Sequence, residues 1–202
     1  MKNTIILIGM SGVGKSYHSR IIKRLYGHTL FSIDDMIAKE IGERNVHDIA
    51  KFLGTPYEGR YKKNSEQYLT LEEKFTKESL TYAEQNPNTK IIIDTTGSLV
   101  HLSKDLLTQL KKYSFTIFLD TNDSLIEEMI ERYILEPKPV IWGELYKEFT
   151  VQNYKKMLKI CYPKLLESRR QAYKTYSQYI LPFETHKQKD FDIFEWIKEN
   201  CR

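Results

Sequence analysis

Eight residues, Gly9-Met-Ser-Gly-Val-Gly-Lys-Ser16, constrain the fold of this chain more than any other segment. They follow the apolar run 4–8 directly and precede a segment with apolar residues at helical spacing, which Gly27 ends. Glycines let the backbone wrap closely around a phosphate with its N–H groups pointing inward, and the following helix start adds partial positive charge. The pattern, set between a strand and a helix, predicts a nucleotide phosphate site.

Two side chains of this loop have separate expected roles. Lys15 reaches the β- and γ-phosphates of ATP, and the Ser16 hydroxyl ligates Mg²⁺. Asp94 closes the apolar run 90–94 and is expected to hold Mg²⁺ or its water shell, although an aspartate at a strand end also commonly caps a turn. The residues expected to contact the nucleotide are Gly9, Ser11, Gly12, Val13, Gly14, Lys15, Ser16 and Tyr17.

Two adjacent acids, Asp34 and Asp35, follow the second apolar run. Ligands of α/β proteins gather at the carboxyl ends of strands, so an acid here can meet an acceptor hydroxyl and take its proton. Asp35 can instead cap the helix that follows. We therefore expect Asp34 to be the catalytic acid-base residue.

The whole chain predicts one α/β domain, residues 1–202, with three layers and a five-stranded parallel sheet. Strands are expected at 4–8, 28–32, 90–94, 115–120 and 179–181, and further helices at about 33–41, 66–85, 99–112, 122–135, 143–160, 164–178 and 190–199. Two segments interrupt this alternation. The polar stretch 43–65 is expected to be a substrate-side insertion, and 136–143, with two prolines, a mobile lid.

Composition excludes several classes of protein. The 31 basic and 27 acidic residues are interspersed, so the net charge of +4 does not indicate a nucleic-acid partner. Apolar runs stay well short of the roughly 20 residues that cross a bilayer, so no membrane partner is expected. Cys161 and Cys201 are too few for a disulfide framework. We expect a cytoplasmic protein with free thiols, monomeric or weakly dimeric, acting on a small molecule.

At this level the chain resembles the shikimate kinase family within the P-loop small-molecule and nucleotide kinases. The matching segments are the loop 9–16, the stretches 31–37, 95–98 and 138–141, and Arg169-x3-Tyr173. The resemblance implies transfer of the ATP γ-phosphoryl group to a hydroxyl. It also implies that Asp34, Thr96 and Gly97 contact the acceptor, that Arg169 grips a substrate carboxylate, that Lys138 replaces the catalytic lid arginine, and that Arg132 lies near the nucleotide.

The chain departs from the family pattern at three points. Thr95-Thr96-Gly97 replaces a glycine triplet, which puts side chains where the substrate ring would approach bare backbone. Leu69 stands where a carboxylate-binding arginine is expected, unless Arg60 in the insertion replaces it. Ser32 replaces a first acid, which leaves magnesium to Asp94. We therefore expect shikimate to be at best a poor substrate.

Two other functions remain open on the sequence. A nucleoside or nucleotide kinase shares the loop, the sheet and the lid, and Tyr57, Tyr61, Asn64 and Gln67 could recognise a base. A nucleotide-binding regulator that has lost transfer chemistry would also fit the altered substrate motifs.

Overall fold

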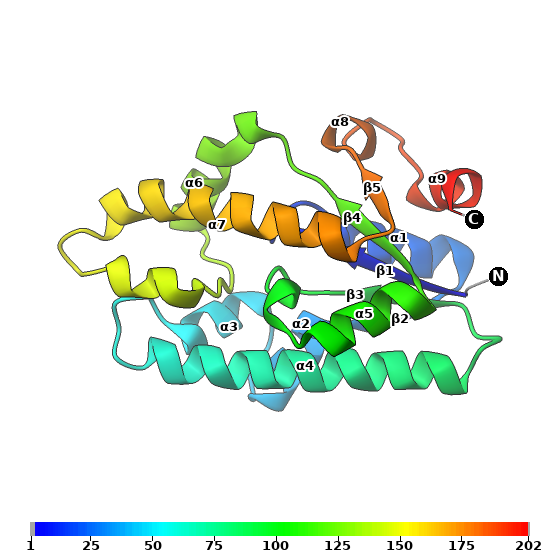
Figure 1. Ribbon diagram of the computed structural model, residues 1–202, viewed down its shortest axis with the longest axis horizontal. Coiled ribbons are helices and arrows are strands. Elements are labelled where there is room, and N and C mark those ends of the chain that lie inside the picture. Colours follow the sequence, from blue (N-terminus) through cyan, green and yellow to red (C-terminus); the bar gives the residue numbers. More distant parts are fainter. Residues whose placement is uncertain (1–2, 202) are drawn as a thin grey trace.

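The computed structural model describes residues 3–201 and contains the predicted five-stranded parallel sheet (Figure 1). The strands are β1 (Thr4–Ile8), β2 (Thr29–Ser32), β3 (Ile91–Asp94), β4 (Phe115–Leu119) and β5 (Tyr179–Leu181). Their order is β2-β3-β1-β4-β5, and every neighbouring pair is parallel. The expected fold class is confirmed, with strand ends within one residue of those predicted.

Helices cover both faces of the sheet. The α-helices are α1 (Lys15–Tyr26), α2 (Ile33–Glu40), α3 (Val46–Leu53), α4 (Tyr61–Gln85), α5 (Lys104–Tyr113), α6 (Ile126–Leu135), α7 (Tyr154–Tyr176), α8 (Phe183–His186) and α9 (Ile193–Asn200). Short 3₁₀ turns lie at Leu99–His101, Asp123–Leu125 and Gly143–Glu148. Helix α1 packs on β1, β2 and β3 and contacts α9, whereas α5 and α7 pack on β4 and α4 packs on α5.

The central strand explains why the sheet lies between two layers. All five residues of β1 are buried, and alternate side chains point to opposite faces. Ile5 and Leu7 join the cluster that includes Ile22 of α1 and Ile193 of α9. Residues 6 and 8 join the larger cluster on the opposite face, with residues of α4, α5 and α7.

The expected polar insertion 43–65 is more regular than its composition suggested. Residues 46–53 form α3, because the Asn45 side chain accepts hydrogen bonds from the backbone N–H groups of His47 and Asp48 and so caps the helix. Residues 61–65 already belong to α4. The sequence also predicted two helices, 143–160 and 164–178, and the break between them is wrong.

A single helix, α7, runs through Pro163 from Tyr154 to Tyr176. Proline removes one intrahelical hydrogen bond, but the buried residues on either side of it, including Leu158 and Leu166, keep the helix packed on the core. The segment before α7, Gly143–Glu148, is a 3₁₀ turn instead of part of a longer helix.

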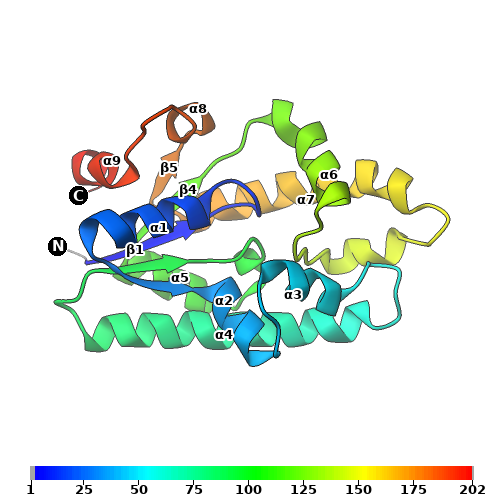
Figure 2. The same ribbon diagram turned by 180° about the vertical axis from the view of Figure 1, so that it is seen from behind.

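The strands all point toward one end of the molecule. Figures 1 and 2 show α2, α3, α6 and the first half of α7 beyond the carboxyl ends of the strands, where ligands of parallel α/β sheets bind. Cys161 and Cys201 are both free and buried. Among the described residues, no helix is long and apolar enough to cross a membrane.

Candidate active site

The phosphate loop adopts a conformation that glycine permits. Gly9, Gly12 and Gly14 all have positive φ, at 144°, 82° and 112°. A Cβ atom on Gly9 would lie 2.7 Å from the carbonyl oxygen of Leu119, so the loop passes too close to β4 for any side chain there. The loop is therefore fixed against the sheet at its first glycine.

The Lys15 side chain is hydrogen-bonded to the loop itself. Its Nζ atom donates to the carbonyl oxygens of Gly9, at 2.8 Å, and Met10, at 3.0 Å. Burial lowers the pKa of Lys15, and the nearby carboxylates Asp94, Asp34 and Glu72 oppose that shift. An ammonium group held this way can exchange its carbonyl partners for phosphate oxygens.

Asp94 lies beside the start of α1, where the loop ends. It is 5% exposed, its Oδ1 atom has no hydrogen-bond partner among the described residues, and it forms a side-chain hydrogen bond with Ser16. Burial raises the pKa of Asp94, while Lys15 and the Ser16 hydrogen bond lower it. The unpartnered carboxylate oxygen next to a hydroxyl fits Mg²⁺, which takes few protein oxygens and keeps several waters.

Asp34 stands at the start of α2, at the end of the neighbouring strand β2. The hydroxyl of Tyr68 donates to its Oδ1 atom at 3.0 Å. Burial raises the pKa of Asp34 to about 6, with Lys15 opposing the shift and Asp94 adding to it. The structure thus places three predicted residues, Lys15, Asp34 and Asp94, close enough to influence one another's charge.

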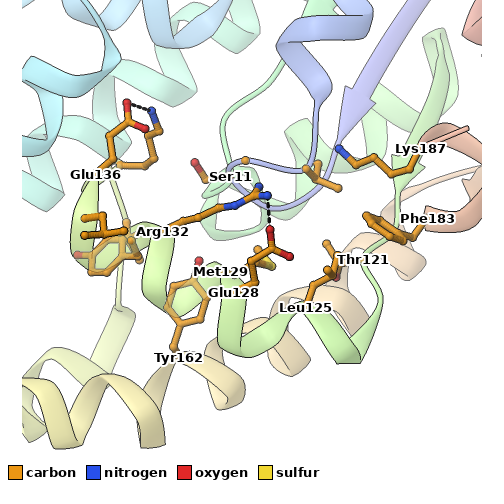
Figure 3. Close-up of a pocket in the computed structure, with 16 residues that line it drawn as sticks. Ser11, Thr121, Leu125, Glu128, Met129, Arg132, Glu136, Tyr162, Phe183 and Lys187 are labelled. Atoms are coloured by element: carbon orange, nitrogen blue, oxygen red, sulfur yellow. Dashed lines mark hydrogen bonds and ion pairs between the residues drawn. The ribbon is translucent and has the colours of Figure 1, made fainter. Parts of the chain in front are cut away.

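A cavity of about 590 Å³ opens beside the phosphate loop (Figure 3). Ser11, Gly12 and Val13 form its loop side, and the predicted Arg132 and Lys138 also line it. Arg132 pairs with Glu128, four residues earlier on α6, and Lys138 pairs with Glu136 at 3.0 Å. Tyr17, by contrast, is 65% exposed and does not line this cavity.

Phe183 and Lys187 are among the lining residues of this cavity that the sequence interpretation missed. Lys187 approaches the loop so closely that a Cβ atom on Gly14 would lie 3.4 Å from its Nζ atom. In Figure 3 Arg132 and Lys187 enter the cavity from opposite sides. Burial and Arg132 lower the pKa of Lys187. The only signal in the sequence was position, because a segment that follows a parallel strand begins at the ligand end of the sheet.

Thr95 and Thr96 do not form the expected wall of side chains. Each is 1% exposed. The Thr95 hydroxyl donates to the carbonyl oxygen of Leu7 at 2.8 Å, and the Thr96 hydroxyl donates to the carboxylate of Glu72. Both side chains are therefore turned into the protein, and Gly97 presents partly exposed backbone at this turn.

Arg169 is 2% exposed, and its guanidinium group bonds to the protein itself. Nη1 donates to the carbonyl oxygen of Gly97 at 2.7 Å, and Nη2 donates to that of Ile141 and to Nε2 of His101. Burial and the charge of Arg169 lower the pKa of His101 to about 4, so a neutral ring accepts this bond. Both Nη groups of Arg169 are thus bonded to the protein in this structure, and the expected contact with a substrate carboxylate stays a prediction.

The C-terminal half of the segment expected to be a lid, 136–143, is hydrogen-bonded to the rest of the protein. The Tyr61 hydroxyl donates to the carbonyl oxygen of Val140 at 3.0 Å and accepts from the backbone N–H of Trp142 at 2.7 Å. Val140, Ile141 and Trp142 are all buried. Residues 136–139, the first half of the predicted lid, make none of these bonds.

Arg60 lies at a second cavity of about 350 Å³, between α3, the loop after it and the segment 137–140. Its Nε atom donates to Glu58 at 2.7 Å. Tyr133, Lys138 and Val140 line both cavities, so the two share a wall. Neither cavity is lined by Asp34 or Arg169.

Comparisons with known proteins agree with this geometry, although no family model matches the sequence. A shikimate kinase of Dehalococcoides mccartyi is 26% identical over 201 residues, which cover 100% of this chain and 94% of that protein. One of Clostridium botulinum is 28% identical over 169 residues, 84% of each protein.

Solved structures show the same fold. The shikimate kinase of Acinetobacter baumannii, in complex with shikimate, superposes with a TM-score of 0.65 at 18% identity, over 98% of this chain and 94% of that one. That of Aquifex aeolicus gives 0.63 at 18% identity, covering 97% and 94%.

The sheet order, the glycine loop with Lys15 and Ser16, and the acid at the end of β3 define a P-loop protein of the kinase type. Within that class, the chain is similar to proteins named shikimate kinase over its whole length, in sequence at 26% identity and in fold.

Proposed function

We propose that this chain transfers the γ-phosphoryl group of ATP to a hydroxyl group of a small polar metabolite. The observation that carries the proposal is the convergence of Lys15, Asp34 and Asp94 at the carboxyl ends of neighbouring strands, next to a loop whose glycines have positive φ. Similarity to proteins named shikimate kinase along the full chain supports the same reaction class.

ATP is assigned to the larger cavity. Its phosphates would lie on the loop 9–14, with Lys15 and Lys187 as cations, and its base would lie among the apolar residues Met129 and Phe183. Arg132 and Lys138 stand on the opposite wall, where a rotation away from Glu128 and Glu136 would bring either cation to the phosphates. Ser16 and Asp94 would hold Mg²⁺, which neutralises phosphate charge when bound.

Asp34 is assigned as the general base. As the acceptor oxygen bonds to the γ-phosphorus, the bond from phosphorus to the oxygen of the leaving ADP breaks, and the acceptor proton passes to Asp34. The raised pKa of Asp34, about 6, suits this role because the carboxylate is ionised at neutral pH and still basic enough to accept a proton. Lys15 stabilises the negative charge that develops between nucleophile and leaving group.

An assay of ADP release across a panel of hydroxylated metabolites tests the proposal. We expect one or more acceptors to stimulate release by the wild type and Lys15→Ala to abolish it. Asp34→Asn should retain ATP binding but lose about two orders of magnitude in transfer, the usual contribution of a positioned base. Lys23→Ala, an exposed change on α1, is the matched control. Wild-type turnover by Lys15→Ala would contradict the mechanism.

A further inference from the structure

Tyr68 brings a hydroxyl group to Asp34 from the first half of α4. Its side chain is 1% exposed, and its hydroxyl donates to Oδ1 of Asp34 at 3.0 Å. Burial and the charge of Asp34 raise the pKa of Tyr68, so the hydroxyl keeps its proton and remains a donor. The polar end of a buried tyrosine therefore lies against the residue assigned as the general base.

The two carboxylate oxygens of Asp34 have different surroundings. Oδ1 accepts from Tyr68, whereas Oδ2 has no hydrogen-bond partner among the residues that the structure describes. Asp34 is only partly buried, and Oδ2 is not one of the enclosed polar atoms of the protein. One oxygen is thus anchored to α4, while the other remains open to take a proton.

The other charged groups near Asp34 do not orient its side chain. They are Lys15 on α1, Asp94 at the end of β3 and Asp35 on α2. The Nζ atom of Lys15 donates to two carbonyl oxygens of the phosphate loop instead, and an ionised carboxylate has no proton to donate. Within residues 3–201, the hydrogen bond that fixes the Asp34 carboxylate therefore comes from Tyr68.

The part of α4 that carries Tyr68 is itself anchored beside the phosphate loop. Glu72 lies one turn further along α4, on the same face, and is fully buried. Its carboxylate accepts from the hydroxyl of Thr96 and, at 2.5 Å, from that of Ser98. Between these two residues, Gly97 packs against the backbone of the phosphate loop. Tyr68 therefore belongs to a frame that has a fixed position relative to the loop.

The same hydrogen bond acts on the charge of Asp34. Burial raises the pKa of Asp34 to about 6 and Asp94 adds to this shift, whereas Lys15 and the Tyr68 hydroxyl oppose it. A donor to the ionised carboxylate stabilises the charged form. Tyr68 therefore helps to keep the base ionised at neutral pH.

We propose that Tyr68 is a positioning residue for phosphoryl transfer, which fixes one oxygen of Asp34 and thereby directs the other toward the acceptor hydroxyl. The proposal rests on the proposed function, with Asp34 as the base, and adds the residue that orients this base. Tyr68 lines neither cavity, so its effect on transfer is exerted through Asp34.

A double-mutant cycle tests whether Tyr68 acts through Asp34. Tyr68→Phe removes the hydroxyl and keeps the buried ring, and at pH 8 it should lower kcat about tenfold without changing the KM for ATP. The same change made in Asp34→Asn should cause no further loss, because no base is left to orient. Tyr82→Phe, on the same helix and outside both cavities, should transfer at the wild-type rate. An unchanged kcat in Tyr68→Phe, or an equal loss in both backgrounds, overturns the proposal.

Carbon-13 NMR of the aspartate carboxyl groups tests the contact without turnover. The signal of Asp34 is the one that Asp34→Asn lacks, and its dependence on pH gives the pKa. In Tyr68→Phe this pKa should be higher by about half to one pH unit, the effect of losing one hydrogen bond to the carboxylate, and in Tyr82→Phe it should equal that of the wild type. An unchanged pKa of Asp34 in Tyr68→Phe overturns the proposal. If the wild type phosphorylates no acceptor, the proposed function fails, and this titration alone decides whether Tyr68 holds Asp34.

Discussion

Arg169 donates a hydrogen bond of 2.7 Å to the carbonyl oxygen of Gly97, the residue whose backbone lies against the phosphate loop. The same guanidinium also reaches Ile141, at the end of the predicted lid. One buried cation thus ties the turn after β3 to the segment over the nucleotide cavity. This is the bracing role of Arg169 in the structure: it holds the turn after β3 and the segment around Ile141 in a fixed relative position.

Arg169→Ala should lower the free energy of unfolding by about 3 kcal/mol, because it removes charge-assisted hydrogen bonds and leaves the Ile141 carbonyl buried without its partner. Arg169→Lys should recover only part of that loss, since one ammonium group cannot span the same acceptors. Urea unfolding followed by circular dichroism measures both. Lys174→Ala, on the exposed side of α7, should remain within about 0.5 kcal/mol of wild type. An Arg169→Ala protein of unchanged stability would refute the bracing role.

Gly97→Ala should disturb the phosphate loop directly. The added Cβ atom would lie 2.9 Å from the backbone nitrogen of Ser11, so the turn and the loop must move apart. We expect a loss of about 1 to 3 kcal/mol in stability, the usual cost of overpacking, together with weaker ATP binding. Calorimetric titration with ATP and magnesium measures the second effect. Gly59→Ala, where a Cβ atom meets nothing within 4 Å, is the control, and ATP affinity equal to wild type in Gly97→Ala would contradict the contact.

Asp34→Asn should stabilise the protein above neutral pH while it slows transfer. The pKa of Asp34 rises from 3.8 to about 6 on folding, so the wild type loses stability as pH increases through that interval. Asparagine has no such titration, and its side-chain oxygen can still accept from Tyr68. The gain should be small at pH 4 and reach about 2 to 3 kcal/mol above pH 7. Unfolding curves at both pH values provide the test, and a gain independent of pH would exclude the titration as its cause.

Lys187→Ala should weaken ATP binding by about tenfold, through loss of one cation facing the phosphate loop. The acceptor KM should not change, because Lys187 lies at the phosphate loop, where the nucleotide is proposed to bind. Lys189→Ala, an exposed lysine two residues further along the chain and outside both cavities, is the matched control. Initial rates at varied ATP measure the difference. Wild-type KM for ATP in Lys187→Ala would remove this residue from the nucleotide site.

The sequence determined the parts of this protein that depend on local pattern. The glycine loop requires positive φ at fixed positions. The spacing of Gly9, Gly14, Lys15 and Ser16 was therefore enough to predict the phosphate site. Apolar strand runs separated by helices predicted the parallel sheet, and the end of each run placed Asp34 and Asp94 at its ligand side. The helix over 46–53 was missed because its stability comes from the Asn45 cap and from packing on α2 and α4, more than from its composition.

The partners of long side chains were decided by tertiary structure. The sequence around an arginine before the last strand is the same whether its side chain binds a ligand or a backbone carbonyl. Arg169 bonds inside the protein because the fold brings the carbonyl oxygens of Gly97 and Ile141 within its reach. Likewise, Thr96 turned inward because Glu72, 24 residues away in sequence, supplies a buried acceptor. Lys187 lies at the loop because β5 ends at the ligand side of the sheet and α8 follows it directly. Local sequence fixes backbone geometry over a few residues, whereas the direction of a flexible side chain depends on which polar groups the completed fold leaves within its reach.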